Sequence, residues 1–178
     1  MKKTLASQWV FGYGSLIWRP GFLFADKRLA TVTGYSRRFC QASHDHRGTP
    51  DAPGRVATLA SVPNSLCQGV AFRIEECVDE ILDLLDVREQ DGYERQLLTL
   101  TFEDGSTEDG ITWIAAEGNP SWREGESLSE VAQVIAQREG PSGSNRDYLF
   151  ELHRALLDAN ITDTYIENLY GKVRSLST

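Results

Sequence analysis

Glu89 is the residue whose position points most directly to chemistry. It shares a helical face with Val78, Leu82 and Leu85, in a segment (residues 75–89) whose apolar residues recur every three or four positions. A carboxylate on that line would face the core or a cleft wall, where lost hydration raises its pKa and suits it to exchange protons near neutral pH. The competing interpretation is that the helix ends here and the side chain turns into water. Periodicity leaves both open.

A glycine-rich turn is the second candidate. An apolar stretch at residues 9–11 predicts a buried strand, and Gly12 and Gly14 follow it, flanking an aromatic residue. Glycine tolerates backbone angles that other residues avoid, so a sharp turn is expected. Free N–H groups at such a turn attract anionic oxygens. We expect this loop to form the floor of an active site, and its residues are Tyr13, Gly14, Ser15 and Leu16.

Other residues carry weaker signals. Ser15 is not in a Gly-x-Ser-x-Gly elbow and nothing marks a base for it, so a local hydrogen bond is favoured over a nucleophile. The two loop glycines lack the rest of a dinucleotide fingerprint. His44 and His46 could ligate one metal, but no third ligand has suitable spacing, which favours a loop or cleft-lining role. Arg37 and Arg38 are interpreted as a solvated pair, although one guanidinium could hold a substrate carboxylate.

Composition limits the classes of partner. The chain has 178 residues, 40% of them hydrophobic, which is enough for one domain, residues 1–178, with a full core. Its net charge of −8 disfavours nucleic acid and anionic membranes as main partners. No stretch approaches the roughly 18 apolar residues of a membrane span. Three cysteines without metal-like spacing predict reduced thiols in the cytoplasm.

The expected elements place strands first and most helices last. Apolar alternation predicts strands at residues 9–11, 30–40, 55–62, 67–74, 93–102 and 110–117. Pro63-Asn64-Ser65 predicts a hairpin turn, and Gly34 a bulge. After the helix at residues 75–89, helices are predicted at residues 127–138, 145–158 and 162–173. This order predicts an α+β domain with a twisted, barrel-like sheet.

Four stretches then combine into a family pattern. They are FGYGSLIW (residues 11–18), SHDHRGTP (43–50) with PGRV (53–56), DVRE (86–89) with Gly92-Tyr93, and GPSGSN (140–145) with Tyr148-Leu149. In this order they resemble the γ-glutamylcyclotransferase superfamily. The histidine loop and the Gly-Pro-Ser-Gly segment resemble its ChaC-like, glutathione-specific branch.

The resemblance implies a fold, a reaction and a site. It implies a mixed fold around a small β-barrel with flanking helices, and cleavage of glutathione to 5-oxoproline and cysteinylglycine without metal or cofactor. Glu89 would be the acid/base, and the loop from Tyr13 to Leu16 would hold the γ-glutamyl group. Tyr93 or Tyr148 is expected to reach the substrate by a hydrogen bond.

Three alternatives stay open. The same fold could act on other γ-glutamyl amino acids or γ-glutamylamines, or it could bind a γ-glutamyl compound without catalysis. A serine hydrolase would depend on Ser15 rather than on Glu89. An acid placed on an apolar line disfavours mere binding, because a buried carboxylate opposes an anionic ligand.

Overall fold

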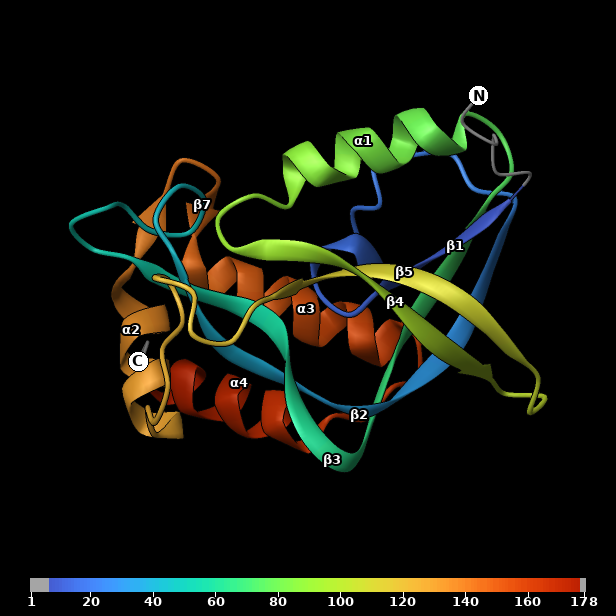
Figure 1. The fold of residues 1–178 in the computed structure, drawn as a ribbon. Coiled ribbons are helices and arrows are strands. Elements are labelled where there is room, and N and C mark those ends of the chain that lie inside the picture. The colour runs from blue at the N-terminus through green and yellow to red at the C-terminus, as the bar shows by residue number, and fades with distance from the viewer. Residues whose placement is uncertain (1–6, 177–178) are drawn as a thin grey trace.

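A closed barrel of five strands is the centre of the molecule (Figure 1). The computed structural model describes residues 7–176, so the ends of the predicted 1–178 domain lie outside the described residues. The strand order is β1-β3-β2-β4-β5, and parallel pairing of β1 with β5 closes the barrel. The expected α+β class with a small barrel is confirmed. The strands are β1 (Gln8–Gly12), β2 (Asp26–Ser43), β3 (Gly54–Ile74), β4 (Tyr93–Phe102) and β5 (Thr107–Ala115).

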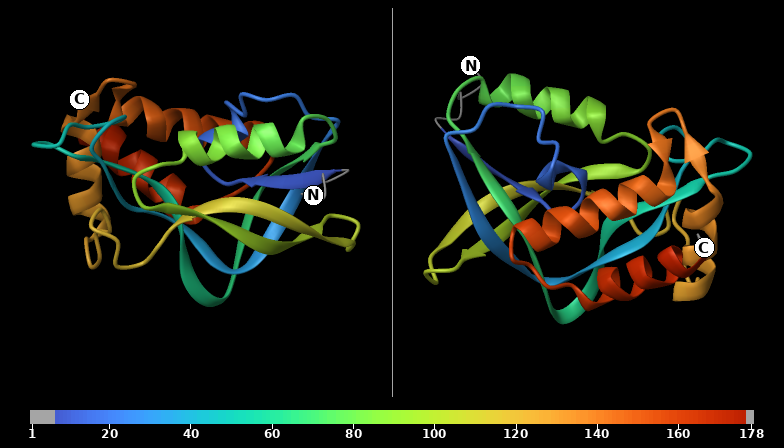
Figure 2. Two further views of the ribbon diagram at one scale, coloured as in Figure 1. Left: turned by 45° about the horizontal axis from the view of Figure 1, so that its top comes forward. Right: turned by 180° about the vertical axis from the view of Figure 1, so that it is seen from behind.

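Helices cover the barrel from two sides (Figures 1 and 2). Helices α2, α3 and α4 pack on one another and share a hydrophobic cluster with the barrel, whereas α1 joins a second cluster with β1 and β5. A short 3₁₀ helix, η1, follows β1, and a two-stranded hairpin, β6–β7, connects α2 to α3. The bounds are η1 Ser15–Ile17, α1 Val78–Arg88, α2 Leu128–Gln137, β6 Glu139–Gly140, β7 Gly143–Ser144, α3 Asn145–Asp158 and α4 Thr164–Leu176.

Side-chain caps explain where the last three helices begin. Ser127 forms a capping box with Glu130 at the start of α2. Ser144 accepts a hydrogen bond from the N–H of Asp147 at the start of α3. Just before α4, Asp163 Oδ1 accepts a hydrogen bond from the N–H of Ile166 at 3.1 Å. These short polar side chains satisfy backbone donors that a helix itself leaves free.

The hairpin predicted at Pro63-Asn64-Ser65 is wrong. β3 runs through these residues as one strand, and both of its halves pair with β2. The ladder joins Thr33 to Leu66 and then Tyr35 to Ser61, so the turn-like residues bulge out opposite Gly34. Gly34 has a φ of 88°, which lets β2 bend at the same place. The bulge expected at Gly34 is present, and the turn-forming residues of β3 lie opposite it instead of forming a hairpin.

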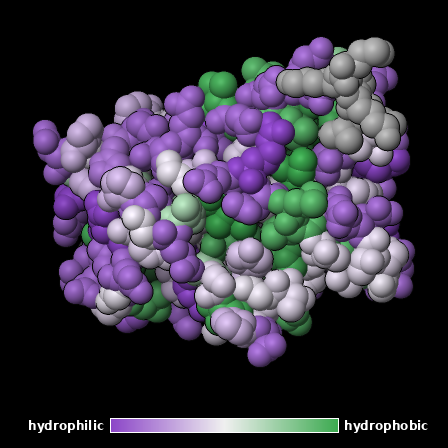
Figure 3. Space-filling model, viewed as in Figure 1, coloured by the Kyte–Doolittle hydropathy of each residue, from purple (hydrophilic) through white to green (hydrophobic). Residues whose placement is uncertain are grey.

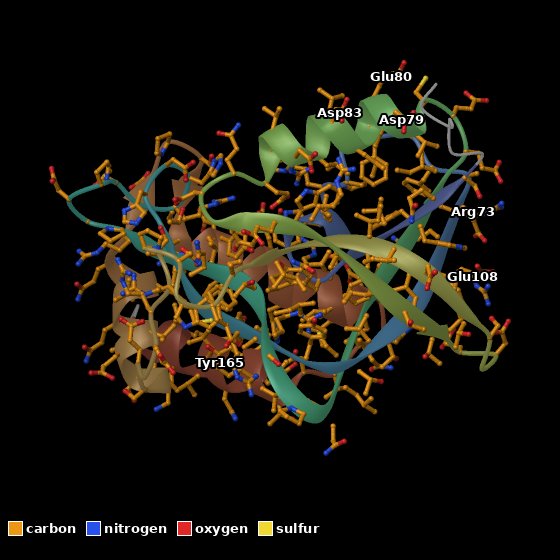
Figure 4. All side chains as sticks on the ribbon, in the orientation of Figure 1. Arg73, Asp79, Glu80, Asp83, Glu108 and Tyr165 are labelled. Atoms are coloured by element: carbon orange, nitrogen blue, oxygen red, sulfur yellow. The ribbon has the colours of Figure 1, made fainter. Side chains whose placement is uncertain are left out.

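The first long helix is shorter than predicted. α1 ends at Arg88, and Glu89 is its C-cap residue with φ −93° and ψ 53°. Asp91 and Gly92 then take positive φ values of 66° and 91°, which reverse the chain into β4. Acidic side chains such as Asp83 project from the outer side of α1 (Figure 4). The other expected helices and strands are present, with ends moved by a few residues.

The surface seen in Figure 3 is mostly hydrophilic, with hydrophobic residues gathered over β4 and β5. Leu97, in β4, is a large hydrophobic residue with an exposed side chain. Within residues 7–176, no helix has both the length and the apolar character needed to cross a bilayer.

Candidate active site

One cavity of about 240 Å³ opens between the barrel, the C-terminal end of α1 and the hairpin β6–β7. In Figure 1 this end of α1 points toward β7, on the left of the view. Because the chain leaves β1 and α1 at this end, the glycine loop and Glu89 meet although they are far apart in sequence. The lining includes every residue that the sequence predicted for the site, namely Tyr13, Gly14, Ser15, Leu16, Glu89, Tyr93 and Tyr148.

Glu89 faces the cavity even though it lies just past the end of the helix. Its side chain is 21% exposed. Burial raises the pKa of the Glu89 carboxyl, while the positive charges of Arg88 and His46 act to lower that pKa. Arg88 Nε lies 3.5 Å from Oε1 of Glu89. The sequence expectation of a desolvated carboxylate therefore agrees with the structure, and the alternative of a side chain turned into water does not.

The loop from Tyr13 to Leu16 is held from the barrel side. The Tyr13 carbonyl accepts a hydrogen bond from Arg37 Nε at 2.7 Å. Gly14 lies so close to Tyr148 that a Cβ on it would be 3.2 Å from the tyrosine hydroxyl. Within residues 7–176, the N–H groups of Gly14, Ser15 and Leu16 have no hydrogen-bond acceptor. Unpaired N–H groups at a turn form a site for an anionic oxygen.

Arg88 fastens this loop from the other side. Its Nη2 donates to Ser15 Oγ at 3.2 Å, and its Nη1 donates to the Pro20 carbonyl at 2.9 Å. The hydroxyl of Ser15 is thus bonded to a cation that cannot act as a base. This contact supports the expected local hydrogen-bonding role of Ser15 and not the nucleophile.

Three tyrosines line the cavity, and their hydroxyl protons differ in availability. The Tyr13 hydroxyl donates to the Trp113 carbonyl at 2.6 Å, and the Tyr93 hydroxyl donates to the Ala57 carbonyl at 2.7 Å. The Tyr148 hydroxyl instead accepts from the Ala57 N–H at 3.4 Å, and its proton has no acceptor among residues 7–176. Burial raises the pKa of Tyr148 to about 12, so the hydroxyl stays protonated. Tyr148 is the tyrosine with a proton to donate.

The opposite side of the cavity is built where two of the family-like stretches meet. His46 Nδ1 lies 2.9 Å from Ser142 Oγ, and the Ser142 N–H donates to the His46 carbonyl at 3.0 Å. A Cβ on Gly140 would be 2.3 Å from that carbonyl, so only glycine permits the approach. His46 and Ser142 line the cavity, whereas His44 does not.

No metal centre arises from the histidine pair. Within residues 7–176, His, Cys, Asp and Glu side chains nowhere come together in a group of three that could hold a metal ion. His44 is half-buried away from the cavity, and His46 is 60% exposed. The structure thus supports the cleft-lining interpretation for His46 alone.

The prediction that Arg37 and Arg38 are both solvated is wrong for Arg37. Only 2% of Arg37 is exposed, and it lies outside the cavity lining, so it does not hold a substrate carboxylate there. Arg38 stacks on Tyr165 at 4.6 Å from the ring centre. A sequence signal existed, because Arg37 alternates in phase with the buried Phe39 along β2.

The family described as "ChaC-like protein" matches residues 8–176. The chain belongs to the ChaC-like family. It is 38% identical to gamma-glutamylcyclotransferase 2-3 of Arabidopsis thaliana, with 96% of this chain and 90% of that protein covered. It is 37% identical to glutathione-specific gamma-glutamylcyclotransferase 1 of Rattus norvegicus, with 94% and 79% covered.

A solved structure supports the same placement. The ChaC-like chain superposes with a TM-score of 0.90 on a gamma-glutamyl cyclotransferase specific to glutathione from yeast, at 31% identity and with 96% and 97% of the two chains covered. The family's named members are enzymes. In the ChaC-like cavity of this chain, a carboxylate of raised pKa, a line of free N–H groups and a protonated tyrosine surround one space. That set suits proton transfer on a substrate with anionic oxygens.

Proposed function

We propose that this ChaC-like protein is a glutathione-specific γ-glutamylcyclotransferase, which converts glutathione into 5-oxoproline and cysteinylglycine. The observation that carries the proposal is Glu89, a desolvated carboxylate that shares a cavity with the free N–H groups of the glycine loop. The name of a mammalian relative and that of the yeast structure support glutathione as the substrate, and the name of a plant relative supports the γ-glutamylcyclotransferase activity.

Glu89 is the proposed acid/base. The α-ammonium of the γ-glutamyl group must lose a proton before its nitrogen can attack the γ-amide carbonyl. The attack forms a C–N bond that closes a five-membered ring, and the C–N bond to cysteine then breaks. The attacking nitrogen loses two protons as it changes from an ammonium to the lactam N–H, and the departing nitrogen gains two as it changes from an amide N–H to an ammonium. Glu89 carries these protons from one nitrogen to the other, so the carboxylate is regenerated. General acid–base help of this kind supplies about 10²–10⁴-fold in rate.

The rest of the cavity has to fold the substrate. The nucleophile is part of glutathione, so holding amine and carbonyl in contact removes most of the entropic barrier, and no metal or cofactor is required. The N–H groups of Gly14, Ser15 and Leu16 are proposed to bind the α-carboxylate or the developing oxyanion. Tyr13 forms a wall for the glutamyl chain, since its hydroxyl is already committed to the barrel.

Tyr148 is the proposed tyrosine donor to the substrate. Its proton is free within the described residues, and the hydroxyl lies beside Gly14. Tyr93 can only accept a hydrogen bond, because its own proton is bound to a backbone carbonyl. The sequence left the choice between Tyr93 and Tyr148 open, and the hydrogen-bond directions favour Tyr148.

The test is direct. Purified protein is incubated with glutathione and a chelator, and 5-oxoproline and cysteinylglycine are followed by mass spectrometry. Equal amounts of both products are expected. Slower turnover of γ-glutamylalanine is expected in parallel. Faster turnover of γ-glutamylalanine would assign the cavity to other γ-glutamyl compounds, and no turnover of either would favour a binding module. A cytoplasmic location, expected from the cysteines, stays a prediction.

A further inference from the structure

Arg37 is buried in the barrel and joins three separate segments. Its Nε donates to the carbonyl of Tyr13 at 2.7 Å, and its Nη2 donates to the carbonyl of Gln68 at 2.5 Å. Its Nη1 forms an ion pair with Oδ2 of Asp163, just before α4. A buried guanidinium with this many partners is costly to desolvate, and it persists because each polar group is satisfied.

The contact with Tyr13 fixes the peptide unit that enters the glycine loop. A trans peptide is planar, and its C=O and N–H point in opposite directions. Arg37 draws the Tyr13 carbonyl into the barrel, so the N–H of Gly14, in the same peptide unit, points away from Arg37. Gly14 lines the cavity and its N–H has no acceptor among residues 7–176.

We propose that Arg37 is a positioning residue that aims and polarises the Gly14 N–H toward an anionic oxygen of the substrate. The assignment rests on the proposed function for the nature of that oxygen, but the peptide geometry does not depend on it. A charged donor on the carbonyl withdraws electron density from the peptide unit and makes its N–H a stronger donor, because hydrogen bonds in a chain reinforce one another.

Asp163 sets the direction of the Arg37 side chain. Its Oδ1 accepts from the N–H of Ile166, and its Oδ2 binds Arg37. The start of α4 therefore holds the guanidinium in place, and the guanidinium holds the loop. The C-terminal helix is in this way connected to the glycine loop, although it contributes no side chain to the cavity lining.

Arg55 provides a matched control. It is buried like Arg37, its Nε and Nη2 bind the Glu126 carboxylate at 2.8 and 2.6 Å, and its Nη1 donates to the Gly54 carbonyl at 2.9 Å. It has the same kinds of partner but neither touches the glycine loop nor lines the cavity. Loss of either arginine leaves a carboxylate without its cation, so both substitutions are expected to lower the melting temperature.

The experiment measures the Gly14 amide by ¹⁵N NMR and kcat/KM for glutathione. In Arg37→Gln we expect a shifted Gly14 amide resonance and a fall in kcat/KM of about 10–100-fold, part of the 10²–10³ that one oxyanion donor supplies. Arg37→Lys keeps a cation and should restore part of both. Arg55→Gln should leave the Gly14 amide in place and kcat/KM within about threefold.

A second variant covers the case in which Arg37→Gln does not fold. Asp163→Asn keeps an oxygen for the Ile166 N–H, since Asn caps helices as well as Asp does, but it cannot pair with Arg37. It should also shift the Gly14 amide. An unchanged Gly14 resonance in either folded variant, with kcat/KM no lower than in Arg55→Gln, would overturn the proposal. If the wild-type protein does not turn over glutathione, the proposed function fails, whereas the amide comparison still decides the role of Arg37.

Discussion

The two walls of the cavity are built differently. The loop wall, formed by residues 13–16 with Glu89 and Tyr148, is tied to the barrel by buried groups, above all Arg37 and the Trp113 carbonyl. The hairpin wall, formed by residues 45–47 with Ser142, rests on two loops that bind each other. On the hairpin wall, His46 is 60% exposed, against 21% for Glu89.

This difference suggests a division of roles. Reacting atoms must be held within a fraction of an ångström, which buried and fully bonded groups can do. An exposed pair of loop side chains loses little when changed, so it suits recognition of the part of the substrate that does not react. We expect the loop wall to govern the rate of cyclisation and the hairpin wall to govern the preference for glutathione.

The largest effect is expected at Glu89. Glu89→Gln keeps the shape of the side chain but cannot exchange protons, so kcat should fall at least about 10²-fold with glutathione binding retained. Asp91→Asn is the matched control. Asp91 also lines the cavity, its Oδ1 accepts from Ser121, and an Asn oxygen can do the same. Steady-state kinetics check both, and a near-wild-type rate in Glu89→Gln would remove the acid/base role.

A smaller effect is expected at Tyr148. Tyr148→Phe removes the one tyrosine proton that is free, so kcat/KM should fall about tenfold, the size of one hydrogen bond to a charged group. Tyr93→Phe removes a proton that the Ala57 carbonyl already binds, so it should lower the melting temperature more than it lowers kcat/KM. A larger fall in kcat/KM for Tyr93→Phe than for Tyr148→Phe would contradict the assigned hydrogen-bond directions.

The pH profile tests the electrostatics of the loop wall. Glu89 acts as a base only when ionised, and burial raises its pKa, so activity should be lost on acidification at a pH above the usual carboxyl value of about 4.3. Arg88 lowers that pKa. Arg88→Met should therefore move the acid limb of kcat/KM to higher pH, while Arg88→Lys should move it less. An acid limb that stays fixed in Arg88→Met would show that another group titrates.

Sequence alone predicted the parts of this site that depend on local pattern. The glycine loop follows a short apolar strand, and Glu89 continues an apolar helical line, so both could be placed without a structure. Arg37 was missed because an arginine is normally solvated, and only its phase with Phe39 along β2 suggested burial. The three tyrosine hydroxyls differ by partners 36 to 100 residues away, which no local pattern encodes.

The failed hairpin has a similar cause. Pro63, Asn64 and Ser65 are turn residues, and Asn64 does take a positive φ of 64°. The local conformation was therefore anticipated, but the pairing was not. Both halves of β3 bind β2 because the bend at Gly34 matches the bulge across the ladder. Strand partners are chosen by the whole sheet, so a turn signal cannot distinguish a hairpin from a paired bulge.

The smallest effect is expected at the hairpin wall, and it concerns selectivity. His46→Gln should lower kcat/KM for glutathione about two- to fivefold, the size of an exposed polar contact, and leave γ-glutamylcysteine, which lacks the glycine, nearly unchanged. His44→Gln is the control, because His44 lies two residues away and outside the cavity lining. Equal losses with both substrates would place His46 in the chemistry of the loop wall and erase the distinction between the two walls.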